Sequence, residues 1–234
     1  MKITELKTIQ FKTQTHSRPN PWGYRIYPRE MLAGEPQEET TTLTELCTDT
    51  GTSGYWLGSG ISPWLKNQLL GANPMDREMF WQMSNGNPLI DFLLWDFAGR
   101  YLEQPVHKLL GGYRDKLACY ASSYPNIGTP EEFADHAEVC VNKGYKAYKI
   151  HAYIYYDPTE MKPAPRSPAF PKQDVEVCMA IRERVGPDIV LMLDQAGIYN
   201  YEEALYVGRA LDELDFFWYE SPMPENNIEP YIRL

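Results

Sequence analysis

Three apolar runs in the second half of the chain each end on side chains that can bind a cation or move a proton. They close at Lys149-Ile150-His151, at Leu193-Asp194 and at Trp218-Tyr219-Glu220. If the runs are strands, alternate residues point the same way, so Lys149 and His151 share one face. Burying Lys, Asp or Glu at a strand end is costly unless the charge is paired or binds a metal. Three successive strands with such an ending indicate a functional cluster.

The residue types in this cluster suit metal-assisted removal of a proton. Asp194 and Glu220, on adjacent strands, can converge on one hard cation, and two carboxylates with waters and substrate oxygens suit Mg²⁺. Lys149 is then a candidate base, with a pKa that we expect to be lowered by the cation, by His151 if protonated, and by desolvation. Such a lysine suits removal of the proton α to a metal-bound carboxylate, with the metal stabilising the resulting enediolate.

Each of these residues also has a structural interpretation. Lys149 could simply pair with a carboxylate. His151 could be a catalytic partner, a hydrogen-bond partner of the substrate, or a pocket histidine whose hydrogen bonds are satisfied. The matching strand-end positions of Asp194 and Glu220 favour the metal site over a structural role, whereas the role of His151 stays open.

The elements that would position this cluster alternate between strand and helix after Arg114. We expect strands at 117–122, 147–151, 189–194 and 216–220, and helices at 130–143, 172–184 and 201–213. Such units predict parallel strands with right-handed crossovers, as in a doubly wound sheet or a (β/α) barrel. No G-x-G-x-x-G follows any of these strands, which counts against a dinucleotide-binding sheet. We therefore expect a barrel, with its active site at the carboxyl ends of the strands.

The preceding residues, 1–114, predict a separate α+β domain. Alternating residues indicate strands at 3–12, 42–48 and 54–57, the last two joined by a hairpin turn at Asp49-Thr50-Gly51. The apolar period then changes to about 3.6, which predicts helices at 62–71, 75–84 and 87–101. A polar, Pro-rich segment from about Thr13 to Glu39 predicts a long loop, which in a compact domain is usually functional or disordered.

The barrel is expected to be incomplete within this sequence. A (β/α) barrel needs eight strands and typically about 250 residues, whereas residues 115–234 supply only about four βα units. A half barrel would leave two parallel edges unpaired, which is an aggregation liability. We therefore expect residues 115–234 to be the first half of a barrel domain whose C-terminal half is absent here.

Charge and cysteine content narrow the classes of partner. The net charge is −10, and no run of Lys and Arg is present. Phosphate backbones and anionic lipid would be repelled, so we expect no nucleic-acid and no membrane partner. The first six residues lack the apolar region of a secretory signal. The widely spaced cysteines, expected to be small buried side chains, indicate a reducing compartment and a cytoplasmic protein; they are Cys47, Cys119, Cys140 and Cys178.

The chain resembles the mandelate racemase/muconate-lactonising branch of the enolase superfamily over its whole length. The resemblance rests on an ordered set of motifs: Ile90-Asp91-Phe92-Leu93-Leu94-Trp95-Asp96-Phe97-Ala98-Gly99-Arg100, Pro105-Val106-His107-Lys108-Leu109-Leu110-Gly111-Gly112, Lys149-Ile150-His151, Leu193-Asp194 and Trp218-Tyr219-Glu220-Ser221-Pro222. It implies an α+β capping domain at 1–114, followed by a (β/α)7β-type TIM barrel of which 115–234 is the first half. It also implies Mg²⁺ held by three carboxylates on successive strands. Asp194 and Glu220 match the first two, and this superfamily is itself the known example of the chemistry described above.

For function, the resemblance implies a Mg²⁺-dependent lyase or isomerase that acts on a small carboxylic acid. We expect dehydration of a sugar acid, which is frequent in this branch, while racemisation, epimerisation and cycloisomerisation start from the same enediolate and remain open. Many relatives carry Lys-x-Lys where this chain has Lys149 and His151, which favours Lys149 as the base. The third metal ligand and the base on the far side of the barrel would lie beyond Leu234.

The resemblance also implies substrate contacts and an assembly. In the family, the long loop after the first strand covers the barrel mouth and selects substrate. Its candidates for substrate contact in this chain are His16, Trp22, Tyr24 and Arg25. We expect a homo-oligomer for the full-length protein.

Two rival functions remain. A Schiff-base aldolase could use Lys149 on a barrel strand, although the paired carboxylates Asp194 and Glu220 count against it. The chain could also be a truncated product or scaffold without catalytic turnover.

Overall fold

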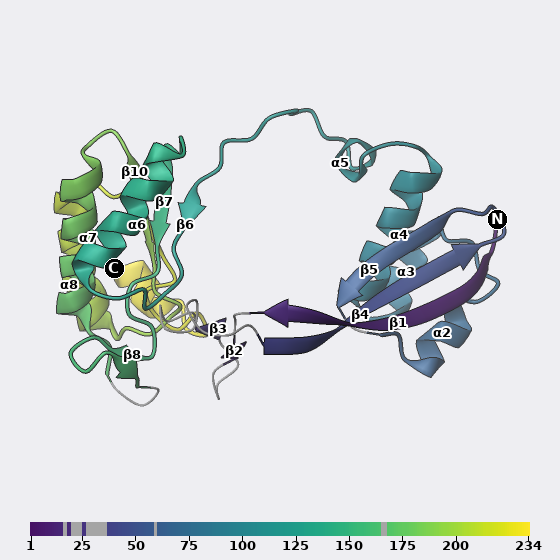
Figure 1. Cartoon of the computed structure of the whole chain (residues 1–234), viewed down its shortest axis with the longest axis horizontal. Helices are drawn as coiled ribbons and strands as arrows, with labels where there is room; N and C mark the ends of the chain where they lie inside the picture. The colour runs from purple at the N-terminus through teal and green to yellow at the C-terminus, as the bar shows by residue number, and fades with distance from the viewer. Residues whose placement is uncertain (16–17, 20–24, 27–36, 59, 165–167) are drawn as a thin grey trace. The chain divides into compact units, whose positions relative to one another are not determined.

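The computed structural model describes residues 1–15, 18–19, 25–26, 37–58, 60–164 and 168–234 (Figure 1). These residues form two compact units. The first comprises Met1–Thr15 and Gln37–Leu117, and the second comprises Ala118–Leu234 with the described residues between His16 and Pro36. In the described part of the chain, no helix is both long and apolar enough to cross a membrane.

The described first unit packs helices against an antiparallel sheet with the strand order β1-β4-β5. Its strands are β1 (Ile3–Thr15), β4 (Gln37–Thr48) and β5 (Ser53–Gly58). Its helices are α2 (Pro63–Leu69), α3 (Arg77–Met83), α4 (Pro88–Tyr101) and α5 (Val106–Leu109). Residues of β1, β4, α2, α3 and α4 share one buried apolar cluster, which includes Ile3, Leu46, Phe80, Leu93 and Phe97.

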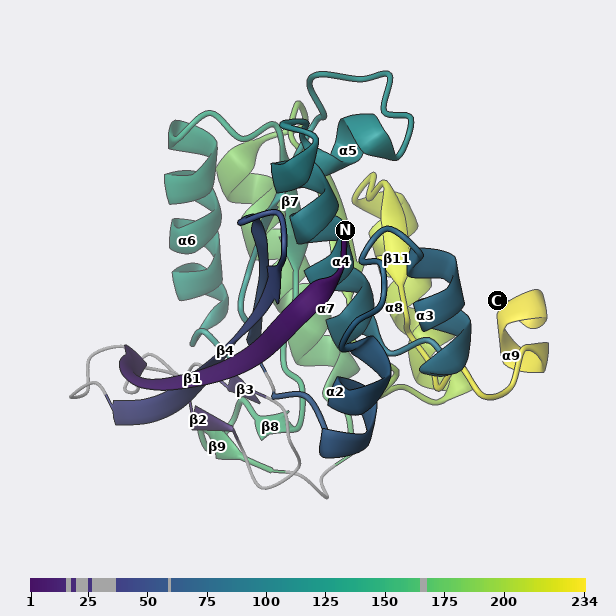
Figure 2. The ribbon, with the colours of Figure 1, turned by 90° about the vertical axis from the view of Figure 1, so that its right-hand side faces the viewer.

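Two strands of the first unit are longer than the alternation of apolar residues predicts. Strands β1 and β4 pair from Ile3 opposite Thr48 to Thr15 opposite Gln37, and they form a long twisted ribbon (Figure 2). Antiparallel pairs need no apolar face where both sides meet water. The backbone ladder therefore continues through polar residues that had been predicted as loop.

In the described second unit, four parallel strands lie in the order β6-β7-β10-β11, which is also their order along the chain. They are β6 (Ala121–Ser122), β7 (Ala147–Ile150), β10 (Val190–Asp194) and β11 (Trp218–Glu220). Successive strands are joined through α6 (Pro130–Asn142), α7 (Pro171–Val185) and α8 (Tyr201–Glu213). A doubly wound sheet would reverse the strand order at a switch point, so this order is the one expected for consecutive units of a (β/α) barrel.

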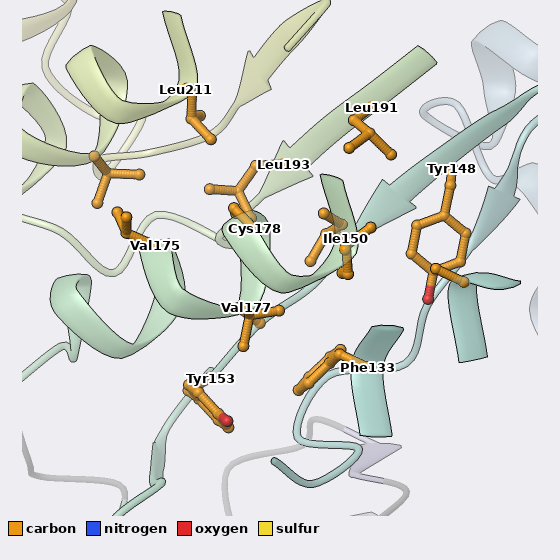
Figure 3. Close-up of a cluster of buried hydrophobic side chains, with 14 of the residues drawn as sticks. Phe133, Tyr148, Ile150, Tyr153, Val175, Val177, Cys178, Leu191, Leu193 and Leu211 are labelled. Carbon is orange, nitrogen blue, oxygen red and sulfur yellow. The ribbon is translucent and has the colours of Figure 1, made fainter. Parts of the chain in front are cut away.

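One face of this sheet packs on the three helices. Figure 3 shows Tyr148 and Ile150 of β7 and Leu191 and Leu193 of β10 among helix side chains such as Val177, and these side chains are fully or almost fully buried. Burying one such apolar side chain contributes about 1.5–3 kcal/mol. Because side chains alternate along a strand, the residues between them point to the opposite face. This packing fixes the side of the sheet on which Lys149 and Asp194 lie.

Several boundaries differ from the predicted ones. Strand β6 pairs with β7 only through Ala121 and Ser122, so most of the predicted strand 117–122 is not paired. The predicted insertion 152–171 contains a short antiparallel pair, β8 (Tyr156–Asp157) with β9 (Lys162–Pro163). The short pair β2 (Arg18–Pro19) with β3 (Arg25–Ile26) interrupts the predicted loop, and a final helix, α9, covers Glu229–Arg233.

The expectation that the cysteines are buried was wrong for three of them. All four are free thiols, but only Cys178 is buried, and Cys119 is exposed. Cys119 lies in the unpaired part of the predicted first barrel strand, which explains its exposure.

Candidate active site

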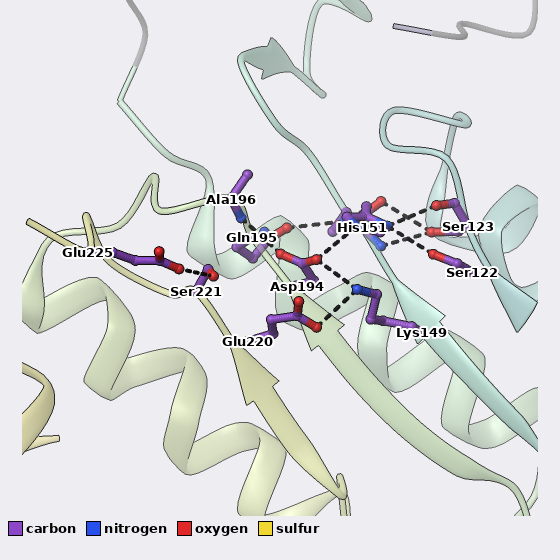
Figure 4. A network of polar contacts seen from close by, with 11 residues as sticks. Ser122, Ser123, Lys149, His151, Asp194, Gln195, Ala196, Glu220, Ser221 and Glu225 are labelled. Atoms are coloured by element: carbon purple, nitrogen blue, oxygen red, sulfur yellow. Dashed lines mark hydrogen bonds and ion pairs between the residues drawn. The ribbon is translucent and has the colours of Figure 1, made fainter. Parts of the chain in front are cut away.

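The predicted cluster lies at the carboxyl ends of three neighbouring strands. Lys149 stands opposite Met192, and Asp194 stands opposite Glu220, in the register of the parallel sheet. His151 follows the last residue of β7. Figure 4 shows the four polar side chains gathered in one contact network. The strand ends therefore bring together the residues that the sequence had singled out.

Lys149 is the centre of this network. Its Nζ donates to Asp194 Oδ2 and to Glu220 Oε2, each at 2.9 Å. The residue is only 8% exposed. Its ammonium also lies 5.7 Å from the centre of the Tyr120 ring. Two carboxylates thus converge on a single positive charge at a largely buried position.

His151 is held in one orientation by Ser123. Its Nδ1 lies 2.9 Å from the Ser123 carbonyl oxygen, and its backbone N–H donates to Ser123 Oγ at 2.8 Å. A carbonyl oxygen can only accept, so Nδ1 carries a proton in this arrangement. The other ring nitrogen, Nε2, lies 3.0 Å from Asp194 Oδ2. Nε2 is therefore the atom of His151 that faces the cluster.

The charged groups of the cluster shift one another's pKa values. Partial burial acts to raise the pKa of Asp194, but hydrogen bonds from His151 and Lys149 outweigh it and lower that pKa well below its usual range. Burial acts to lower the pKa of Lys149, but hydrogen bonds to Asp194 and Glu220 outweigh it and raise that pKa. In this metal-free arrangement both carboxylates hold the ammonium form, whereas the expected lowering of the Lys149 pKa refers to a site with a bound cation and stays a prediction.

Strained backbone follows both carboxylates. Ala196 has φ +52° and Ser221 has φ +41°, a left-handed conformation that costs a residue other than glycine on the order of 1–3 kcal/mol. The Ala196 N–H donates to Asp194 Oδ1 at 3.3 Å. The Gly197 N–H donates to the Ser221 carbonyl at 2.7 Å and so ties the two strand exits together. Strain of this kind persists where the surrounding structure fixes it, which is common at functional sites.

The donor set fits Mg²⁺. Within the described residues, no group of three or more His, Cys, Asp or Glu side chains is close enough to hold a metal ion. Two carboxylates do converge on the position of the Lys149 ammonium. Mg²⁺ is commonly held by one or two carboxylates while it keeps several waters. Asp194 and Glu220 are therefore the residues of this chain that would hold it.

The predicted substrate contacts are not placed by the structure. His16, Trp22 and Tyr24 lie outside the described residues. Arg25 lies in β3, and only its backbone is described.

Sequence reasoning missed Ser123, although a signal for it existed. Ser122-Ser123 ends the first barrel strand on polar residues, as Asp194 and Glu220 end theirs. Ser123 is 4% exposed, and its only sequence mark is this position. Sequence reasoning also missed Asp174, Gln195 and Tyr199, which are joined by buried hydrogen bonds. No spacing in the sequence links those residues.

Comparisons with known proteins identify similar sequences and structures. A family model described as "Enolase C-terminal domain-like" matches residues 132–234. The structure is similar to that of D-glucarate dehydratase from Agrobacterium tumefaciens complexed with magnesium, with a TM-score of 0.82 and 32% identity. That similarity covers 99% of this chain and 63% of the other.

Two curated relatives point the same way. Arabinonate dehydratase of Saccharolobus solfataricus is 31% identical over 62% of this chain and 36% of the relative. N-succinyl-L-Arg/Lys racemase of Bacillus cereus is 29% identical over 86% of this chain and 57% of the relative. The chain thus spans between about a third and two thirds of the length of the relatives it matches. On these similarities, residues 132–234 match the enolase C-terminal domain-like family, and the chain as a whole is similar to enolase-superfamily dehydratases and racemases.

Proposed function

We propose that this chain takes part in Mg²⁺-dependent removal of the proton α to the carboxylate of a small acid. The observation that carries the proposal is the convergence of Asp194 and Glu220 on Lys149 Nζ, each at 2.9 Å. In the proposal, Asp194 and Glu220 are metal ligands, and Lys149 and His151 act on protons. When bound there, Mg²⁺ supplies charge that lowers the cost of the negative charge developing on the substrate carboxylate.

Lys149 is the proposed base. While its Nζ holds both carboxylates, its raised pKa keeps it in the ammonium form, which cannot accept a proton. Lys149 becomes able to take a proton at Nζ only when Asp194 and Glu220 have another partner, since their hydrogen bonds are what raise its pKa. Binding of a cation by Asp194 and Glu220 would therefore allow Lys149 to act as a base.

His151 is proposed to exchange a proton through Nε2. Ser123 holds the proton on Nδ1, so the ring cannot turn without losing that bond. Dehydration of a hydroxy acid requires protonation of the departing hydroxyl, and Nε2 is the nitrogen that faces the cluster. A donor at this position favours dehydration over reactions that only return the proton to carbon.

Dehydration of a sugar acid is the reaction that we place first. Its support is His151 together with the similarity to D-glucarate dehydratase and to arabinonate dehydratase. Racemisation or epimerisation is the second candidate, supported by the similarity to N-succinyl-L-Arg/Lys racemase. Cycloisomerisation starts from the same intermediate. A Schiff-base aldolase and a non-catalytic product remain the rivals that the experiment below must exclude.

The proposal extends to substrate contacts, partners and location. His16, Trp22, Tyr24 and Arg25 are proposed to contact substrate. The proposed partner is a small carboxylic acid, with no nucleic acid and no membrane, in a homo-oligomer. The four free thiols support a reducing, cytoplasmic location.

The test is a screen of sugar acids with the protein expressed from its complete gene, in D₂O with and without Mg²⁺. Dehydration gives a 2-keto-3-deoxy acid carrying one solvent deuterium, and we expect this product with Mg²⁺ only. Deuterium in unchanged acid, without loss of water, would favour racemisation or epimerisation instead. Turnover unaffected by excess EDTA, or trapping of substrate on Lys149 by borohydride, would contradict the proposal.

A further inference from the structure

One carboxylate outside the candidate site, Asp174, is fully buried. Asp174 belongs to the first turn of α7 and is 0% exposed. Its Oδ1 accepts from the Tyr153 N–H at 3.0 Å, and its Oδ2 accepts from the Tyr199 hydroxyl at 2.5 Å. A buried carboxylate is costly unless donors satisfy it, and each such group in a native structure calls for an explanation.

The contacts of Asp174 continue through two further side chains. Gln195 Nε2 donates to the Tyr199 hydroxyl oxygen at 2.7 Å. Gln195 Oε1 in turn accepts from the Ala152 N–H at 3.2 Å. Both ends of this chain of hydrogen bonds therefore reach the same backbone segment, Ala152-Tyr153. One end reaches it through Gln195, and the other reaches it through Asp174.

This chain of hydrogen bonds has one direction. The Ala152 N–H can only donate, so Gln195 must present its oxygen there and its amide N–H to Tyr199. The hydroxyl of Tyr199 has one proton, and it donates this proton in the hydrogen bond to Asp174. An ionised carboxylate can only accept, so it is the group that closes the chain without leaving a donor unpaired.

The ends of the chain coincide with the candidate site. Ala152 follows His151 directly, and Gln195 follows Asp194 directly. The Gln195 N–H also donates to the Glu220 carbonyl at 3.3 Å. The network thus joins the exits of β7, β10 and β11 to helix α7.

We propose that Asp174 is a positioning residue whose buried carboxylate, through Tyr199 and Gln195, fixes the backbone that carries His151 and Asp194. It touches neither Lys149 nor the two carboxylates of the site. The inference rests on the proposed function only for the meaning of that site, since the ordering of residues 151–153 can be measured without metal or substrate.

The charge of Asp174 costs stability and so points to a role beyond folding. Burial raises the pKa of Asp174 to about 7, against the lowering effect of hydrogen bonds from Tyr199, Tyr153 and Gln195. The titratable groups that face it come from the segments packed around it: Tyr153, Cys178, Tyr199, Glu203 and Tyr219. A neutral apolar residue would avoid this cost, whereas a satisfied polar network specifies one arrangement of its partners.

Asp174→Asn tests the donor-to-acceptor direction of these hydrogen bonds. The amide can still accept from the Tyr153 N–H, but it then turns an NH₂ toward Tyr199, whose hydroxyl loses its acceptor. We expect faster amide hydrogen exchange at Ala152 and Tyr153 in the metal-free protein expressed from its complete gene. We also expect Mg²⁺ affinity to fall on the order of 10–100-fold, as for other residues that orient metal ligands.

Two further variants keep the test decisive. Glu183→Gln, an exposed acid on the same helix, is the matched control and should change none of these quantities. Tyr199→Phe keeps the ring and removes only the hydroxyl, so it decides the matter if Asp174→Asn does not fold. It should reproduce the faster exchange at Ala152 and Tyr153.

The outcomes separate this inference from the proposed function. Faster exchange at Ala152 and Tyr153 in a folded variant supports the positioning role, even if the wild-type protein binds no Mg²⁺. Wild-type exchange rates at both amides in folded Asp174→Asn or Tyr199→Phe would overturn it. So would exchange that rises equally over the whole chain, because that result describes a purely structural residue.

Discussion

Lys149 Nζ lies 2.9 Å from Asp194 Oδ2, although the two residues are 45 positions apart in the sequence. The same nitrogen lies 2.9 Å from Glu220 Oε2. An ammonium between two carboxylates stabilises the pair of negative charges, and a divalent cation at that place would do the same. Lys149 and a metal ion therefore compete for the same oxygens, and this competition gives the following predictions.

Asp194→Asn should weaken Mg²⁺ binding and abolish exchange of the substrate α-proton. The amide keeps the shape of the side chain but loses the charge that a hard cation requires. Isothermal titration with Mg²⁺ measures the first effect, and deuterium incorporation measures the second. Asp188→Asn, an exposed residue shortly before β10, is the control. Wild-type affinity in Asp194→Asn would remove Asp194 from the metal site.

Lys149→Met should stop α-proton exchange while Mg²⁺ affinity is kept or increased. The change removes the proposed base and also the charge that competes for Asp194 and Glu220. Exposed Lys116 provides the matched control, as Lys116→Met. A loss of Mg²⁺ affinity in Lys149→Met would show that the ammonium helps rather than opposes the metal. Exchange that persists for one substrate epimer would assign the base for that epimer to another residue.

Stability should fall as pH rises through the range in which Asp174 ionises. Its pKa is raised to about 7 by burial, whereas an aspartate in an unfolded chain has a pKa of about 3.9. Between these values the folded protein keeps a proton that the unfolded chain has lost, so the free energy of unfolding declines with pH. Urea unfolding at a series of pH values should show this decline, and Asp174→Asn should make it shallower. Equal slopes in both proteins would contradict the raised pKa.

The backbone at Ala152 and Tyr153 should become more ordered as pH rises, although the free energy of unfolding falls. Above about pH 7 Asp174 is ionised and closes the hydrogen-bond chain, whereas its protonated form can donate to Tyr199 and disturb the direction. Amide exchange at Ala152 and Tyr153, corrected for its intrinsic pH dependence, should therefore slow as pH rises through this value. The step should be absent in Asp174→Asn. A step of equal size in the variant would assign it to another group.

Gly54→Ala should destabilise the first unit by about 1–3 kcal/mol, the usual cost of overpacking. A Cβ at this position of β5 would lie 2.4 Å from the Leu93 carbonyl oxygen and 2.8 Å from Phe97 Cβ, so α4 would have to move. Gly60→Ala is the control, because its Cβ would meet only the Thr8 side chain at 3.4 Å. Thermal unfolding measures both variants, and equal transition temperatures would contradict the close packing of β5 on α4.

Much of the fold follows from local signals in the sequence. The capping box at Thr129 and Glu132 places the start of α6, and Pro88 after the capping residue Asn87 places that of α4. Polar residues that end apolar strands identify Lys149, Asp194 and Glu220, because a charge at such a position needs a partner. The length of β1 and β4 was missed, since backbone pairing between polar residues leaves no apolar pattern.

The support of the site could not be predicted in the same way. Asp174 in the first turn of a helix has an ordinary explanation, because acidic residues are favourable there. Its contacts with Tyr153 and Tyr199 join positions 21 and 25 residues away, which only the packed structure brings together. The raised pKa of Lys149 was missed for a related reason. Its sign depends on whether the carboxylates hold the lysine or a cation, and no pattern of residues contains that information.

The most direct test of the competition between Lys149 and a divalent cation is anomalous diffraction from crystals of the protein grown with Mn²⁺ in place of Mg²⁺. We expect one anomalous peak bound by Asp194 and Glu220, with Lys149 Nζ moved away from both carboxylates. Mn²⁺ bound at other residues, while Lys149 still bridges Asp194 and Glu220, would contradict the account.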